Sequence, residues 1–93
     1  MDRKHRGAAS QLTAMAWLLE QGYEVFPNCS AHGPVDIIGR KDGFISLFDV
    51  KTRDPNLQPK RYRNGAQSLS AEQLEQNVKL LLVDRGGTCT ITT

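Results

Sequence analysis

Two aspartates and a lysine in the middle of the chain have the types and spacing needed for metal-dependent chemistry. Asp36 begins one β-prone run, and Asp49 and Lys51 end the next. The Asp42-Gly43 dipeptide between the runs is a strong signal for a two-residue β-hairpin loop. Pairing that starts at this loop places Asp36 opposite Asp49. Because side chains alternate along a strand, Lys51 lies on the same face as Asp49.

This arrangement predicts a site that needs a compensating charge. Like charges opposite each other in a ladder are destabilising, and buried carboxylates are costly unless they are paired or bound to metal. Mg²⁺ is commonly held by one or two carboxylates together with substrate phosphates. A structural ion cluster of Asp36, Asp49 and Lys51 without metal is the alternative, and the spacing alone leaves both open.

The elements that must position these residues follow from hydrophobic periodicity and turn signals. A helix is predicted over residues 8–21, with its core stripe at Ala8, Leu12, Met15, Ala16 and Leu19. Strands are predicted at residues 23–26, 36–40 and 44–51, followed by a long basic loop to residue 69. A capping box, Ser70-Ala71-Glu72-Gln73, starts a second helix that continues through Val78 and Leu81. A last strand covers residues 88–93, which gives the order αβββαβ and a mixed four-stranded sheet flanked by helices.

Length and composition agree with one globular α/β domain over residues 1–93. The chain is 39% hydrophobic and 24% charged, which excludes a disordered or collagen-like protein, and no run approaches the ~20 apolar residues of a membrane span. Cys29 and Cys89 are the only cysteines. Two cysteines in a chain that can form a core without them indicate a reduced, intracellular (cytoplasmic) protein.

Positive charge is clustered although the net charge is only +2. The basic residues gather in the loop and at the amino end, at Arg53, Lys60, Arg61, Arg63, Arg3, Lys4 and Arg6. A phosphate backbone favours such clusters, so they are predicted to bind DNA; a solvated basic loop is the alternative.

The motifs Pro34-Val35-Asp36 and Asp49-Val50-Lys51 resemble the signature of the PD-(D/E)XK nuclease superfamily. The spacing Gly7-x-x-x-Gln11, then Gly22-Tyr23-x-Val25, then His32-Gly33-Pro34, is similar to small Holliday-junction-resolvase-like members and intron homing endonucleases. The similarity extends from about Gly7 to Ile91.

The resemblance implies a restriction-endonuclease-like fold and a Mg²⁺-dependent (or Mn²⁺-dependent) DNA endonuclease that hydrolyses phosphodiester bonds. It implies that Asp36, Asp49 and the Val50 carbonyl bind the metal, and that Lys51 positions or activates the attacking water. The alternative is a catalytically weak or inactive module that binds DNA or DNA junctions. The substrate among junctions, specific sites, flaps and damaged DNA stays open.

Three further residues are candidates for the site. Gln11 stands where relatives often carry a metal-binding Glu; it either joins the catalytic group or flanks the core. Gln73 either completes the capping box or faces the site, and His32 either contacts a phosphate or is a solvated loop residue.

Three apolar residues fall off the predicted helical stripes, namely Trp17, Leu80 and Val83. A chain this small has little structure to cover them, so they predict a homodimer or higher homo-oligomer, with an exposed but loop-covered Trp17 as the alternative.

Overall fold

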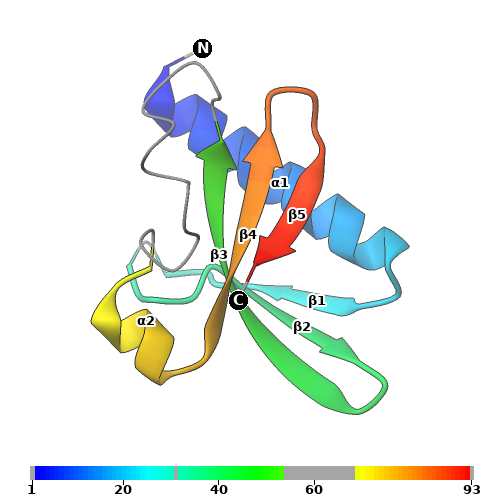
Figure 1. The fold of residues 1–93 in the computed structure, drawn as a ribbon. Coiled ribbons are helices and arrows are strands. Elements are labelled where there is room, and N and C mark those ends of the chain that lie inside the picture. Colours follow the sequence, from blue (N-terminus) through cyan, green and yellow to red (C-terminus); the bar gives the residue numbers. More distant parts are fainter. Residues whose placement is uncertain (1, 31, 54–68, 93) are drawn as a thin grey trace.

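The computed structural model describes residues 2–30, 32–53 and 69–92, and it has one mixed five-stranded sheet with two helices (Figure 1). The elements in chain order are α1 Arg3–Glu20, β1 Glu24–Pro27, β2 Ile37–Lys41, β3 Phe44–Arg53, α2 Ala71–Glu75, β4 Val78–Asp84 and β5 Cys89–Thr92. The strand order is β1-β2-β3-β4-β5. The pair β3–β4 is parallel and the other three pairs are antiparallel. Helix α1 crosses one face, and α2 lies beside the start of β4 (Figure 1).

The predicted β2–β3 hairpin is confirmed. Lys41 pairs with Phe44 and Ile37 with Phe48, the register expected from a two-residue loop. Asp42 and Gly43 have φ angles of 53° and 81°. A loop with two positive φ angles has the twist that suits a hairpin, which explains why Asp and Gly occupy it.

Helix α1 was correctly expected, but its start and its buried face were not. It begins at Arg3 rather than at residue 8, because the carboxylate of Asp2 caps it by accepting a hydrogen bond from the amide of His5 at 2.9 Å. The buried residues are Ser10, Ala14 and Leu18.

The stripe predicted for the core therefore faces outward over much of its length. Leu12 and Leu19 are 64% and 59% exposed, and Ala8 and Ala16 are also exposed. Two small side chains, Ser10 and Ala14, are buried against the sheet, and Ser10 Oγ lies 2.7 Å from Thr52 Oγ1 of β3. Because Ser10 is polar, the pattern of hydrophobic residues alone selected the wrong side.

The second helix is much shorter than predicted, and this corrects the fold. Helix α2 ends at Glu75, and Asn77 has a φ of 60°, a left-handed conformation that stops a helix. The segment Val78–Asp84 is a strand that pairs in parallel with β3. It is an apolar run buried on both faces, which periodicity does not distinguish from a buried helix. The order is αβββαββ with five strands, not αβββαβ with four.

The sheet separates two clusters of buried side chains. The α1-side core consists of Ala14, Leu18, Ile37, Phe48, Leu81 and Val83. The α2-side core consists of Leu69, Val78, Leu80 and Leu82. Leu80 and Val83 are thus buried within the monomer, and Trp17 is partly buried against the α1-side core. The three residues predicted to mark an oligomer interface are therefore packed inside the chain, and that basis for self-association is wrong.

Within residues 2–30, 32–53 and 69–92, no helix is long and apolar enough to cross a membrane. Cys29 and Cys89 are both free thiols.

Candidate active site

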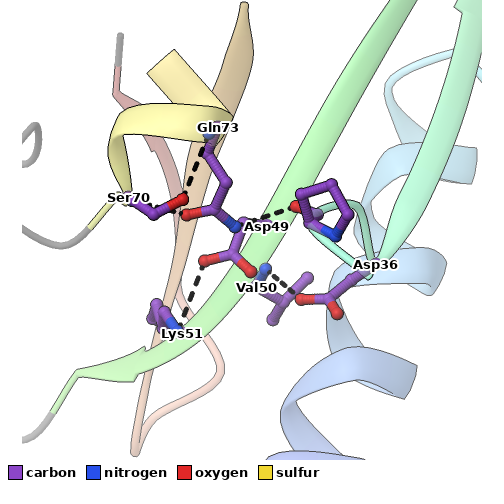
Figure 2. Close-up of polar contacts among 7 residues, drawn as sticks. Asp36, Asp49, Val50, Lys51, Ser70 and Gln73 are labelled. Carbon is purple, nitrogen blue, oxygen red and sulfur yellow. Dashed lines mark hydrogen bonds and ion pairs between the residues drawn. The ribbon is translucent and has the colours of Figure 1, made fainter. Parts of the chain in front are cut away.

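The register of β3 with β4 puts Asp49 and Lys51 on one face of the sheet. Asp49 lies opposite Leu80 and Lys51 opposite Leu82, which both belong to the α2-side core, whereas Val50 packs against the α1-side core. The Lys51 Nζ lies 3.5 Å from Asp49 Oδ2. The predicted neighbourhood of the acid and the lysine is confirmed (Figure 2).

Asp36 lies just before β2 and is held against β3 by two hydrogen bonds. Its amide donates to the Phe48 carbonyl at 2.9 Å, and its Oδ2 accepts from the Val50 amide at 2.7 Å. In a strand, the N–H and C=O of one residue point to the same side. The Val50 carbonyl is therefore directed toward the side on which Asp36 lies, beyond the end of β2.

Asp49 is an unusually placed carboxylate because it is only 6% exposed. Burial raises its pKa to about 6, and the neighbouring negative charge of Asp36 adds to the rise, while Lys51 and Gln73 act in the opposite direction. Among the described residues, its Oδ2 has no hydrogen-bond partner, although Lys51 is near. A buried carboxylate oxygen without a hydrogen bond is suited to a cation, and in this structure the Lys51 ammonium at 3.5 Å is the cation that faces it.

Gln73 fixes α2 to the loop that precedes Asp36. Its Nε2 donates to the Pro34 carbonyl at 2.8 Å, and its Oε1 accepts from the Ser70 amide at 2.8 Å. The Gln73 amide donates to Ser70 Oγ at 3.1 Å, which completes the predicted capping box. Gln73 is 8% exposed and lies close enough to Asp49 to lower its pKa (Figure 2). Gln73 therefore caps α2, as predicted, and it also borders the acid pair; a part in an active site stays a prediction.

The other two candidates, Gln11 and His32, are not shown in contact with the acid pair in the part of the chain that the structure describes. Gln11 is half-buried in α1 directly after Ser10, whose Oγ lies 2.7 Å from Thr52 Oγ1 in β3, and its role stays a prediction. His32 is exposed, and its carbonyl accepts a 3.5 Å hydrogen bond from Asn28 Nδ2. Within the described residues, no hydrogen bond or ion pair joins His32 to Asp36 or Asp49.

The basic residues divide into two groups. Lys60, Arg61 and Arg63 lie outside the described residues. Arg53 is exposed at the end of β3, and Arg3 and Lys4 are exposed in the first turn of α1, where Arg6 is half-buried. The sequence prediction missed the Pro34 carbonyl as a partner of Gln73. A backbone carbonyl leaves no signal in residue type.

The residues present fit a divalent cation. Asp36 and Asp49 are adjacent, one Asp49 oxygen lacks a hydrogen-bond partner, and the Val50 carbonyl is directed toward this side. Mg²⁺ needs only one or two protein carboxylates. In the part of the chain that the structure describes, no group of three His, Cys, Asp or Glu residues gathers, so among these residues the acid pair is the candidate anchor.

Comparison of the chain with protein-family models and with curated proteins finds no match.

Proposed function

We propose that this protein is a metal-dependent DNA endonuclease of the PD-(D/E)XK type. The observation that carries the proposal is the buried carboxylate Asp49, with Asp36 beside it and Lys51 at 3.5 Å, on the second strand of the confirmed β2–β3 hairpin. The same three residues form the motif that resembles the superfamily, and the strand that was not predicted, β4, pairs with β3 without displacing them.

Each residue has a distinct part in the proposed reaction. Asp36 and Asp49 hold the cation, with the Val50 carbonyl as a third ligand. When bound, Mg²⁺ supplies a Lewis acid that polarises the phosphodiester and lowers the pKa of a bound water. Lys51 is 46% exposed at its side chain, so its ammonium group can reach a water or a phosphate oxygen while remaining near Asp49. Its positive charge stabilises the charge that develops on the phosphate.

Plasmid nicking tests this proposal. Wild-type protein should nick supercoiled DNA with Mg²⁺ or Mn²⁺ and not with EDTA, and Asp36→Ala, Asp49→Ala and Lys51→Ala should each abolish nicking. Glu75→Ala is the matched control, because it removes a carboxylate from the exposed end of α2. Nicking that persists in Asp49→Ala would show that another activity produces it.

A second candidate is a module of the same fold that binds DNA or junctions without cutting it. The observation that favours it is Gln11, since an amide offers a neutral oxygen where relatives often carry a carboxylate. This candidate predicts salt-dependent DNA binding without metal-dependent nicking.

We also propose that the protein self-associates through the outer side of α1. This side carries an exposed apolar stripe made of Ala8, Leu12, Ala16 and Leu19. The stripe is the basis for the proposed interface in place of Trp17, Leu80 and Val83, which pack within the monomer. An apolar stripe on an otherwise polar helix is typical of an interaction surface.

A further inference from the structure

A pocket of about 320 Å³ lies between the first turns of α1, the end of β3 and the turn that joins β4 to β5. Its lining includes Arg6, Ser10 and Thr13 of α1, Thr52 of β3, and Arg85. Thus two arginines, one serine and two threonines, from separate elements, line one hollow.

These side chains have the chemistry of an oxyanion site. Guanidinium groups donate several hydrogen bonds in a fixed plane, which matches the oxygens of a phosphate. Hydroxyl groups from other directions suit the remaining oxygens of a tetrahedral anion. Ser10 is only 7% exposed, and its contact with Thr52, at 2.7 Å between the oxygens, fixes both hydroxyls between α1 and β3.

Asp84 also lines the pocket, and its charge opposes an anion. Its Oδ1 accepts a 2.9 Å hydrogen bond from the Thr88 amide, which holds the β4–β5 turn in shape. In the sheet register Asp84 lies opposite Arg53, whose positive charge is near this end of the sheet. Among the described residues that line the pocket, the two arginines Arg6 and Arg85 outnumber the single aspartate.

The pocket adjoins the candidate active site across β3. Thr52 directly follows Lys51, and consecutive side chains of a strand point to opposite faces about 3.3 Å apart along the chain. The pocket is therefore on the α1 side, and the acids and Lys51 are on the α2 side, of the same strand end. This is the carboxyl end of two neighbouring parallel strands, where open α/β sheets commonly bind ligands.

We propose that this pocket binds a phosphate group of the nucleic-acid backbone, with Arg6 and Arg85 as its charged donors. The identity of the ligand rests on the proposed function; the anion site itself rests on the lining. Arg85 thereby becomes a nucleic-acid contact outside the basic loop and the amino-terminal cluster.

Duplex binding without metal tests the assignment independently of cleavage. Fluorescence anisotropy with a labelled duplex in EDTA should show that Arg85→Gln and Arg6→Gln each weaken binding by about tenfold. Each should also reduce the slope of log K against log salt by about 0.9, because one phosphate contact is lost. Arg40→Gln is the matched control: it removes an exposed guanidinium, paired with Glu24 at 2.7 Å, that does not line the pocket. Equal effects of Arg85→Gln and Arg40→Gln would overturn the proposal.

Inorganic phosphate separates the anion site from its proposed ligand. At matched ionic strength, millimolar phosphate should raise the melting temperature of the wild type relative to chloride and compete with the duplex, and Arg85→Gln should lose both effects. A phosphate effect lost in Arg85→Gln, with duplex affinity unchanged, would overturn the nucleic-acid assignment. Failure of plasmid nicking alone does not affect these measurements, so this inference and the proposed cleavage fail separately.

Discussion

At the residue scale, the raised pKa of Asp49 connects the site to stability. Its pKa is about 6 in the folded chain against an ordinary value of 3.8. The folded state therefore binds the proton more tightly than the unfolded state does. The stability from this proton is fully present below about pH 4 and is lost as the pH rises through 6.

Asp49→Asn should remove that dependence on pH. In EDTA, the free energy of unfolding of the wild type should fall relative to that of Asp49→Asn between pH 4 and pH 7, by at most about 3 kcal/mol. Denaturant titrations of both proteins at four pH values provide the measurement. Parallel pH profiles would mean that Asp49 ionises as a solvated carboxylate does, and would remove the main support for a cation at this position.

The variant Gln11→Glu tests whether the Gln11 side chain lies next to the proposed cation or only flanks the hydrophobic core. If Gln11 is next to the site, a third carboxylate should raise the affinity for Mn²⁺ and lower the stability of the metal-free protein, which metal should then restore. Calorimetric titration and melts with and without metal check both effects. Gln21→Glu, at the end of α1, is the control. Identical titrations of wild type and Gln11→Glu would place Gln11 outside the site.

At the element scale, an element could be predicted from the sequence when neighbouring residues alone specify it. The β2–β3 hairpin was predicted with its register because Asp42 and Gly43 specify the turn by themselves, and Ser70 with Gln73 likewise specified the start of α2. The segment Val78–Asp84 was assigned to a helix because its state depends on pairing with β3, which is remote in sequence. The proximity of Asp36 and Asp49 was predictable from the hairpin, but their direct pairing was not found: the ladder ends at the Ile37–Phe48 pair, and Asp36 bonds to the Phe48 carbonyl and the Val50 amide instead. The link of the acid pair to α2 through the Pro34 carbonyl was not predictable, because that link is a tertiary contact.

Replacing Gln73 should destabilise the protein more than removing the N-cap hydroxyl of Ser70. Ser70→Ala removes one capping acceptor and should cost about 1 kcal/mol. Gln73→Leu loses the capping acceptor and also leaves the Pro34 carbonyl without its donor, and it should cost about 1–3 kcal/mol more than Ser70→Ala. It should also raise the pKa of Asp49, because Gln73 helps to hold that pKa down. Denaturant unfolding measures the first effect and the pH dependence of stability the second. An equal loss of unfolding free energy in Ser70→Ala and Gln73→Leu would mean that Gln73 contributes to stability only through the capping box.

At the scale of the whole molecule, α1 has one buried side and one exposed apolar side. Ser10, Ala14 and Leu18 pack on the sheet, and the apolar stripe with Leu12 and Leu19 faces outward. The hydrophobic pattern alone assigned the outer stripe to the core. The spacing of apolar residues does not distinguish a helix face that is buried in the monomer from an apolar face that is exposed.

If the protein self-associates through this stripe, substitutions in the stripe should change the oligomeric state without changing the stability of the monomer. Leu12→Gln with Leu19→Gln should produce a smaller species in sedimentation at micromolar concentration, with stability changed by no more than about 0.5 kcal/mol, because both side chains are exposed in the monomer. Trp17→Glu should instead destabilise the monomer, because Trp17 packs against the α1-side core and a charge there would be partly buried. Phe44→Ser controls for removal of any exposed apolar side chain, since Phe44 is 76% exposed at the β2–β3 turn, away from α1. If the wild type sediments as a monomer at high concentration, or if Phe44→Ser has the same effect as the double variant, the outer side of α1 is not the interface.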